Sequence, residues 1–432
     1  MKEVGVGLIG FGEIGTGVVA ILRNNRDIIS QRTGMDLVLK KIADIDLKRD
    51  RGVPVDRAIL TKDGNALVAD PAVAIVIELV GGTTAAKDFV LKAIAARKPV
   101  VTANKALLAE HGAEIFAAAE KAGTDVYFEA AVAGGVPLIR ALTRGLVANR
   151  IESIHGILNG TCNYILTRMT KEHLPFDVVL KDAQAAGYAE ADPALDIDGF
   201  DTAHKAAILA SLAYGCRVPL DGIRAEGIRN LAQADIEYAR ELGYVIKLLA
   251  AIRQIEGEIE VCVRPALVQA DHTLASVGGV FNAILIKGDA VGETLYYGQG
   301  AGRMPTASAV VGDLVDAAHG VLSGCRMGSC APRNLLRDGH IREQGDLKTR
   351  YYLRMSLLDR PGTMGTICAV LGDNGVSIAS VRQQEEQAGE YVPVIIITHS
   401  VQERRMDAAV KKIDTLDIVN SKTVRIRIED FV

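Results

Sequence analysis

The chain has 432 residues, which is too long for one compact core, so two or three domains are expected. Its net charge of −4 and the lack of a lysine- and arginine-rich block argue against nucleic acid as a partner. No apolar run approaches the about 20 residues that a membrane span needs, and the first residues lead into an apolar run without a secretion signal. Six cysteines without a CxxC spacing are typical of structural thiols in a reducing compartment. We therefore expect a cytoplasmic protein.

The first 130 or so residues alternate strand-like and helix-like segments. Apolar runs predict buried strands at Val4–Ile9, Leu37–Ala43, Ala72–Val80, Pro99–Ala103 and Asp125–Ala130. Helical stretches rich in Ala and Leu lie between them, at Val18–Arg26, Ala85–Arg97 and Lys105–Ala122. Because strands that are apolar on both faces alternate with helices, an α/β domain with a parallel sheet is expected over residues 1–134.

The pattern changes after Gly134-Gly135. Residues 135–320 mix helices, predicted at Thr202–Ala213 and Asp235–Ile252, with strands such as Ile259–Val268, which indicates a second, α+β domain. Residues 321–348 are mostly polar and aperiodic, as is typical of a linker.

The last unit, residues 349–432, has the predicted order βαββαβ of a ferredoxin-like fold. Its expected strands are Tyr351–Leu358, Val376–Val381, Val392–Thr398 and Thr423–Ile428, with a turn at Ala388-Gly389 between the middle two. Its expected helices are Met364–Gly372 and Glu403–Leu416.

A glycine-rich loop, Gly10-Phe11-Gly12-Glu13-Ile14-Gly15, follows the first strand and opens a helix. The GxGxxG spacing allows a tight turn and lets a pyrophosphate rest on the helix N-terminus, so a Rossmann domain that binds a dinucleotide is expected. Asp44 follows the second strand, where a carboxylate binds the ribose and repels a 2′-phosphate. Nearby cations could instead hold that phosphate: Lys40, Lys41, Lys48 and Arg49. The cofactor is thus NAD or NADP, with Asp44 favouring NAD.

An acidic segment runs from Glu190 through Asp196 to Asp201, and Lys205 follows Asp201 by one helical turn. A solvated acidic loop with a capping Asp is one interpretation, whereas a metal site fits poorly because the spacing is too wide for a hard-cation loop. The alternative is a pocket for a substrate ammonium beside a lysine that moves a proton as hydride leaves. On this interpretation the protein is a nicotinamide-dependent dehydrogenase.

A second lysine, Lys105, follows Val101-Thr102-Ala103-Asn104 at the carboxyl end of a predicted strand. That end of an open α/β sheet faces the ligand crevice. Since a lysine gains little from opening a helix, a role in the site is favoured over a structural one.

These motifs together resemble the homoserine dehydrogenase family over nearly the whole chain. The resemblance rests on the glycine loop and on Val101–Ala109, Phe128–Arg140, Gly156–Leu166, Gly187–Lys205 and Tyr297–Ala307. It implies interconversion of L-homoserine and L-aspartate 4-semialdehyde, with Lys205 as proton donor and Lys105 at the nicotinamide and substrate. Glu190, Asp196 and Asp201 would hold homoserine, and the α+β domain over residues 135–320 would serve catalysis and dimerisation. The implied cofactor contacts are Gly10, Phe11, Gly12, Glu13, Ile14, Gly15, Asp44, Gly81, Thr102, Lys105 and Gly302.

The resemblance has three further implications. A monovalent cation, Na⁺ or K⁺, would be held mostly by backbone carbonyls of Glu129, Val132, Gly134 and Val136. Gly302 would contact the cofactor, and residues 302–320 would return as a helix to the first domain. Many relatives have a basic residue where this chain has Asp44-Ile45-Asp46, which speaks against a preference for NADP.

The carboxy-terminal unit resembles an ACT domain, a module that binds amino acids at its interfaces. Its ligand would lie at Asp359-Arg360-Pro361-Gly362 and Asn374-Gly375-Val376, with L-threonine as the leading effector. A plain dimerisation module is the alternative. Either role is typical of a homodimer or homotetramer.

Two rival functions deserve weight. Cys162 could be the nucleophile of an acylating semialdehyde dehydrogenase, with His155 or His204 as base. A non-catalytic amino-acid sensor with a vestigial Rossmann domain is the second rival, but the pair Lys105 and Lys205 argues against it.

Overall fold

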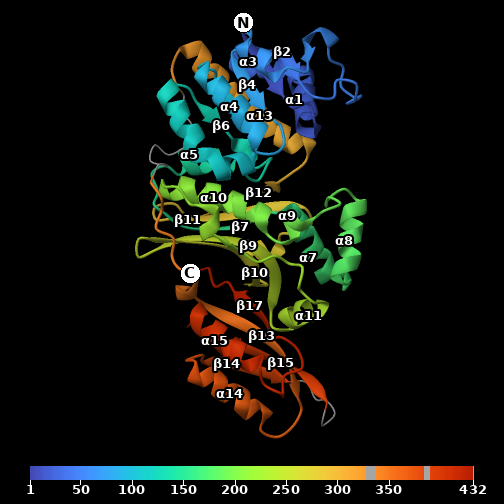
Figure 1. Ribbon diagram of the computed structural model, residues 1–432, viewed down its shortest axis with the longest axis vertical. Coiled ribbons are helices and arrows are strands. Elements are labelled where there is room, and N and C mark those ends of the chain that lie inside the picture. Colours follow the sequence, from blue (N-terminus) through green and yellow to red (C-terminus); the bar gives the residue numbers. More distant parts are fainter. Residues whose placement is uncertain (327–336, 384–389, 432) are drawn as a thin grey trace.

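The computed structural model describes residues 1–326, 337–383 and 390–431. Its three units follow one another along the long axis, with the amino-terminal domain at one end and the carboxy-terminal unit at the other (Figure 1). Within these residues no helix is both long and apolar enough to cross a membrane.

The first domain is built on a six-stranded parallel sheet with the order β3-β2-β1-β4-β5-β6. Its strands are β1 (Lys2–Ile9), β2 (Met35–Ala43), β3 (Leu60–Thr61), β4 (Ile75–Glu78), β5 (Val100–Thr102) and β6 (Val126–Tyr127). The strand order reverses between β1 and β4, so a ligand crevice opens at the carboxyl ends of these strands. The predicted α/β sheet is confirmed.

Six helices cover this sheet. They are α1 (Glu13–Asn24), α2 (Arg26–Thr33), α3 (Gly64–Ala69), α4 (Thr84–Ala95), α5 (Lys105–Ala122) and, from much later in the chain, α13 (Arg303–Ser323). α13 packs closely against α1, because a Cβ on Gly17 would lie 2.7 Å from the Arg303 carbonyl and 2.8 Å from Ala307 Cβ. The late helix therefore belongs to the core of the first domain.

The remaining described strands form one eleven-stranded sheet. They are β7 (Ile151–Ile157), β8 (Arg224–Ala225), β9 (Tyr244–Ile255), β10 (Glu258–Gln269), β11 (Phe281–Gly288), β12 (Gly292–Gln299), β13 (Lys348–Leu358), β14 (Ile378–Gln383), β15 (Tyr391–Thr398), β16 (Val401–Gln402) and β17 (Val424–Ile428). The main order is β12-β11-β7-β9-β10-β17-β13-β15-β14, with β8 beside β10 and β16 beside β13.

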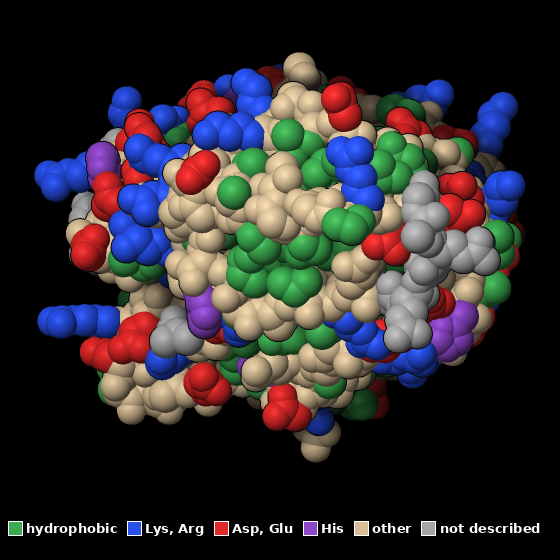
Figure 2. Space-filling model, turned by 90° about the horizontal axis from the view of Figure 1, so that it is seen from below, with side chains coloured by type: hydrophobic (Ala, Val, Ile, Leu, Met, Phe, Trp, Pro, Cys, Tyr) green, Lys and Arg blue, Asp and Glu red, His purple; other side chains and the backbone are tan. Residues whose placement is uncertain are grey.

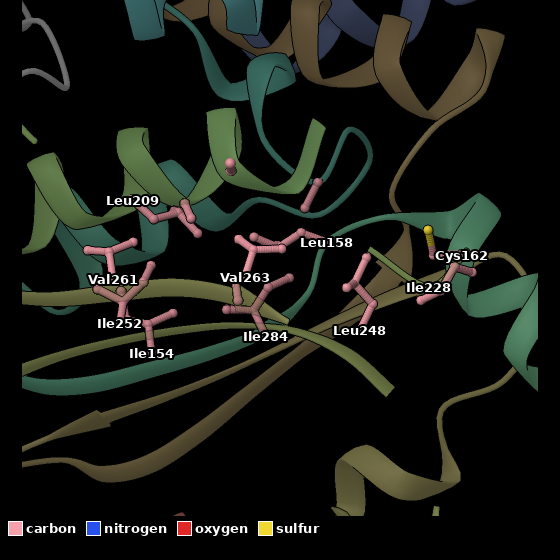
Figure 3. Close-up of a cluster of buried hydrophobic side chains, with 14 of the residues drawn as sticks. Ile154, Leu158, Cys162, Leu209, Ile228, Leu248, Ile252, Val261, Val263 and Ile284 are labelled. Carbon is pink, nitrogen blue, oxygen red and sulfur yellow. The ribbon is translucent and has the colours of Figure 1, made fainter. Parts of the chain in front are cut away.

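Helices cover the second domain's part of this sheet. They are α6 (Leu138–Arg140), α7 (Gly160–Glu172), α8 (Phe176–Ala185), α9 (Ala194–Ile197), α10 (Phe200–Tyr214), α11 (Gln233–Glu241) and α12 (Thr273–Ser276). Aliphatic side chains of the strands meet those of α10 in a buried cluster (Figure 3). The carboxy-terminal unit adds α14 (Thr363–Asp373) and α15 (Glu403–Ile413), and its predicted βαββαβ order is confirmed with β16 inserted.

The predicted helix Asp235–Ile252 is wrong beyond its first turns. α11 ends at Glu241, Gly243 turns the chain with a φ of 81°, and the rest forms β9. β9 is a central strand with its residues from Ile246 to Ile252 buried. A strand buried on both faces shows no alternation of polar and apolar residues, so its Leu- and Ala-rich run resembled a helix.

The sheet is continuous between the second domain and the carboxy-terminal unit. β17 pairs in parallel with β10, at Ala266 with Arg427 and Leu267 with Ile428, and antiparallel with β13. The described ends of the predicted linker, residues 321–348, are structured and contact the other domains. α13 occupies its start, and Asp338 and Ile341 form bridges with the second domain. Its residues 327–336, and the predicted turn Ala388-Gly389, lie outside the described residues.

Candidate active site

The glycine loop has the geometry of a phosphate cradle. Gly10 has a φ of 97°, and a Cβ there would lie 2.5 Å from the Leu79 carbonyl. A Cβ on Gly15 would lie 2.2 Å from the Gly10 carbonyl, so both positions require glycine. Gly12 caps α1, and a Cβ there would meet no atom within 4 Å, which leaves room for a pyrophosphate at the helix N-terminus.

Asp44 is tied to the glycine loop and to an arginine that sequence reasoning missed. The Phe11 N–H donates to Asp44 Oδ2 at 2.6 Å, and Arg51 Nη2 lies 3.1 Å from Asp44 Oδ1. The Arg51 guanidinium also lies over the Phe11 ring, 4.6 Å from its centroid. Only 8% of the Arg51 side chain is exposed. The charge of Asp44 is thus compensated. Arg51 lies in an aperiodic loop, where nothing in the sequence pattern singles it out.

Hydrogen bonds connect the carboxyl ends of β4 and β5. Buried Glu78 accepts from the Val80 N–H and from Thr102 Oγ1, both at 2.6 Å. Burial raises the pKa of Glu78 to about 7. Asn104 caps α5 and donates to the carbonyls of Val80 and Gly82. These bonds hold the backbone around Gly81 and Thr102, two of the expected cofactor contacts.

Lys105 and Lys205 converge on one carboxylate. Asp201 Oδ1 lies 3.2 Å from Lys105 Nζ, and Asp201 Oδ2 accepts from Lys205 Nζ at 2.7 Å. Lys205 also donates to the Leu158 carbonyl at 2.7 Å. Lys105 comes from the first domain at the start of α5, whereas Asp201 and Lys205 come from α10 of the second. The residues predicted for chemistry therefore meet where the two domains face each other.

Asn159 joins the two acids of this cluster. Its Nδ2 donates to Asp196 Oδ1 at 2.7 Å and to Asp201 Oδ2 at 2.9 Å. Its Oδ1 accepts from the Cys162 N–H at 2.8 Å and so caps α7. Sequence reasoning could have predicted the cap, since Asn before a helix is favoured there, but not the bonds to residues 37 and 42 positions later.

The two acids have opposite electrostatic environments. Burial alone would raise the pKa of Asp201, but the charges of Lys205 and Lys105 outweigh it and hold this pKa well below its usual range. The pKa of Asp196 is raised, first by burial and then by the nearby charge of Asp201. Asp201 is therefore an ionised partner for both lysines at neutral pH.

Glu190 does not join this cluster. It lies in an exposed segment, and its carbonyl accepts from Gln184 Nε2 at 3.0 Å. No hydrogen bond or ion pair of its carboxylate is found among the described residues. The structure thus brings together Asp196, Asp201 and Lys205 from the acidic segment and leaves Glu190 facing solvent.

The surroundings of Cys162 argue against the acylating alternative. The side chain lies within the buried hydrophobic cluster, and its thiol donates to the Asp196 carbonyl at 3.2 Å (Figure 3). Burial raises the pKa of this thiol well above its ordinary value, so the nucleophilic thiolate is disfavoured. His155 is buried beside Glu429, and burial lowers the pKa of His204.

The segment from Glu129 to Val136 could hold a cation only through its backbone. The Glu129 carboxylate already accepts the N–H groups of Ile139 (2.8 Å) and Arg140 (2.9 Å). The described residues contain no cluster of three or more acidic, histidine or cysteine side chains suited to a metal. Carbonyl oxygens alone suit a weakly bound Na⁺ or K⁺ better than a transition metal.

Gly302 caps the N-terminus of α13 with a φ of 116°. The next residue, Arg303, donates to Glu13 at the start of α1, at 2.7 Å. The late loop therefore reaches the cofactor cradle, as expected for a segment that closes over it.

A Rossmann sheet whose carboxyl edge faces paired lysines and a buried carboxylate defines the class of nicotinamide-dependent dehydrogenases. The comparisons with known proteins narrow the class. Family models match at residues 10–129 ("Homoserine dehydrogenase, NAD binding domain"), 137–315 ("Homoserine dehydrogenase") and 351–417 ("ACT domain"). The chain belongs to the homoserine dehydrogenase family.

Relatives and solved structures extend this similarity over the full length. The homoserine dehydrogenase of Neisseria gonorrhoeae is 44% identical and that of Pseudomonas aeruginosa 43%, each over 99% of both chains. The crystal structure of a homoserine dehydrogenase from Thiobacillus denitrificans is 45% identical, with a TM-score of 0.93 over 100% of this chain and 99% of that one.

Proposed function

We propose that the protein interconverts L-homoserine and L-aspartate 4-semialdehyde with a nicotinamide cofactor. The observation that carries this proposal is Asp201, held between Lys105 and Lys205 where the two domains face each other. A substrate that carries both an ammonium and a reacting oxygen suits carboxylates beside lysines.

In this proposal the residues of the cluster have separate roles. Lys205 gives its proton to the aldehyde oxygen in the reductive direction, and Asp201 keeps its ammonium oriented. Asp196, Asp201 and Glu190 provide negative charge for the substrate ammonium, Glu190 from the exposed side. Lys105 lies between the substrate and the cofactor. The bound cofactor supplies or accepts the hydride.

The cofactor preference is proposed to depend on Asp44 and Arg51 together. Asp44 favours NAD, but its charge is offset by Arg51, so NADP is accepted as well. The structure of a hyperthermophilic archaeal homoserine dehydrogenase, 27% identical, was solved in complex with NADPH.

The ratio of kcat/KM for NADP over NAD tests this cofactor proposal. Asp44→Ala should raise the ratio, because a repelling carboxylate is lost, and Arg51→Ala should lower it. Losing one charge-assisted contact of about 1.5–3 kcal/mol corresponds to roughly 10- to 100-fold. Unchanged ratios in both variants would place the ribose recognition elsewhere, with Lys48 and Arg49 as the next candidates.

We further propose a homo-oligomer regulated through the ACT domain, with L-threonine as effector. Gly362 caps α14 with a φ of 90°, and nothing lies within 4 Å of a Cβ there, which leaves space for a ligand. Figure 2 shows hydrophobic side chains gathered on the outer face of this end of the molecule, a feature common at subunit contacts. Among the described residues five cysteines are unpaired, which supports a reducing cytoplasmic setting.

Formation of NAD(P)H from L-homoserine in the absence of phosphate tests the activity. The proposed enzyme should give it, and Na⁺ or K⁺ should raise the rate if the carbonyls from Glu129 to Val136 bind a cation. An acylating dehydrogenase would instead need the semialdehyde together with phosphate, and a sensor would give no turnover with either substrate.

A further inference from the structure

A short segment, Arg224–Arg229, lies between the ACT domain and the acidic segment of the active site. Its first two residues form β8, which pairs in parallel with β10 at Cys262 and Val263. The Glu226 N–H continues this pairing by donating to the Val263 carbonyl at 2.8 Å. We call residues 224–229 the connecting segment.

On one side, the connecting segment contacts charged side chains of the ACT domain. Arg427 of β17 donates from Nη1 to Glu226 Oε2 at 2.9 Å, and its Nη2 bonds to Glu403 at the start of α15. Arg224 reaches the same Glu403 at 3.3 Å. Arg427 is only 3% exposed and Glu403 is fully buried, so these ion pairs have little water to replace them.

On the other side, the connecting segment contacts the backbone of the acidic segment. A Cβ on Gly227 would lie 2.0 Å from the Ile197 carbonyl, and the Ile228 N–H donates to that carbonyl at 2.8 Å. Arg229 forms two bonds with Asp198, at 2.9 and 2.8 Å. The two backbones are therefore in direct contact, and one cannot shift toward the other without displacing it.

The part of the acidic segment that contacts residues 224–229 is close in sequence to both Asp196 and Asp201. Ile197 directly follows Asp196, whose carboxylate accepts from Asn159. Asp201 follows Asp198 by three residues and lies in the first turn of α10, which Gly199 caps with a φ of 87°. A change in the position of Glu226 therefore acts on the two acids proposed to face the substrate.

We propose that Glu226 and Arg427 are positioning residues for homoserine binding, through which the ACT domain sets the geometry of the acidic segment. Neither residue touches the reacting cluster, and each acts through Gly227, Ile228 and the backbone of Ile197. The inference rests on the proposed role of Asp196 and Asp201 in holding the substrate. It predicts that this ion pair affects the KM for L-homoserine and leaves cofactor binding alone.

The chain offers a matched control pair. Arg354 of β13 forms two bonds with Asp235 of α11, at 2.6 and 3.0 Å. This pair also joins the ACT domain to the second domain, and Asp235 is fully buried. Its carboxylate contacts Tyr352 and the start of α11 instead of the acidic segment.

The test compares Glu226→Gln, Arg427→Gln and their double variant with Asp235→Asn, Arg354→Gln and theirs. Both sets should lower Tm, because each loses an ion pair in which one partner is buried, Arg427 in the first and Asp235 in the second. Only the first set should raise the KM for L-homoserine, by about 2- to 30-fold, with the KM for the cofactor unchanged. In the double variant the rise in KM should be less than the product of the two single rises, because the Glu226–Arg427 ion pair is lost in all three variants.

Two results would overturn the inference: an unchanged KM for L-homoserine in the first set, or an equal rise in the control set. Should Arg427→Gln fail to fold, Glu226→Gln alone still decides, since it keeps the shape of the side chain and leaves Arg427 paired with Glu403. Asp201→Asn, measured alongside, distinguishes failure of the positioning role from failure of the proposed substrate site. If it lowers kcat/KM for L-homoserine while Glu226→Gln changes nothing, only the positioning role fails. If Asp201→Asn also has no effect, the proposed substrate site fails with it.

Discussion

Asp201 is the residue on which the electrostatics of the site depend, because its carboxylate contacts the ammonium groups of both Lys105 and Lys205. The two lysines come from different domains, so the carboxylate also connects those domains at the reacting centre. Removing one lysine leaves the other to balance the charge of Asp201. The fold should therefore tolerate substitution of either lysine better than substitution of Asp201 itself.

Lys205→Ala should lower kcat for homoserine oxidation by about 10²- to 10⁴-fold, because the group that accepts the hydroxyl proton in this direction is lost. Cofactor affinity should barely change, since Lys205 lies in the second domain. Initial rates and cofactor titrations measure both quantities. Lys247→Ala is the control, because Lys247 is also buried but donates to the Val277 carbonyl, away from Asp201. A Lys205→Ala enzyme that kept a third or more of its kcat would contradict the role.

Asn159→Ser separates the two tasks of the Asn159 side chain. Serine still caps α7, but it cannot donate an amide hydrogen bond to both Asp196 and Asp201. Hydrogen bonds to charged groups are worth about 1.5–3 kcal/mol, so kcat/KM for homoserine should fall roughly 10- to 100-fold. Thermal unfolding provides the comparison: a loss of Tm without a loss of kcat/KM would mean that Asn159 serves only the fold.

Glu78, the last residue of β4, is a titratable group that is buried at the carboxyl ends of the strands in the first domain. Burial raises the pKa of Glu78 from 4.5 to about 7, so the folded state binds its proton more tightly than the unfolded state. The stability that this proton contributes is complete below pH 4.5 and is lost as the pH rises to about 7. The loss is on the order of 3 kcal/mol.

Glu78→Gln should remove this pH dependence, because the amide does not ionise. The free energy of unfolding, measured by denaturant titration between pH 5 and 8, should fall less steeply in the variant than in the wild type. Glu114→Gln on α5 changes an exposed carboxylate and serves as control. Parallel curves for Glu78→Gln and the wild type would show that Glu78 is ionised in the fold at all these pH values.

Elements with local determinants were predictable from sequence, and elements that depend on distant partners were not. The glycine loop, the helix that begins at Lys105 and the i to i+4 spacing of Asp201 and Lys205 depend on residues close together in the chain, and the structure has each where expected. β9 was mistaken for a helix because its burial comes from strands and helices elsewhere in the chain. Asn159 and Arg427 were missed for the same reason, since their partners are remote in sequence. Arg51 was missed because it lies in an aperiodic loop and its contact with Phe11 spans 40 residues of chain.

For the whole molecule, regulation would start at the far end of the long axis from the cofactor (Figure 1). An effector changes activity only if it binds one arrangement of the enzyme better than another, and a coupling of about 1–3 kcal/mol shifts apparent affinity roughly 5- to 150-fold. The continuous sheet and the ion pairs of Arg427 provide physical contact between the two ends.

Gly362→Val should weaken inhibition by L-threonine while sparing turnover without it. Valine strains a position with a φ of 90°, by about 1–2 kcal/mol, and fills the space at the start of α14. The concentration for half inhibition measures the effect. Gly34→Val imposes similar strain in the first domain, at a φ of 72°, and should leave inhibition unchanged. If the wild type ignores millimolar threonine, the ACT domain is a dimerisation module.

The place of β17 has a consequence for how the protein is made. This strand comes later in the chain than every other described strand, yet it lies in the interior of the sheet, between β10 and β13. Until residues 424–428 have left the ribosome, β10 and β13 each have an unpaired edge that can associate with other nascent chains. The second domain therefore completes its sheet only after nearly all of the protein has been synthesised. Premature termination before residue 424 should yield aggregates in place of a shorter working enzyme.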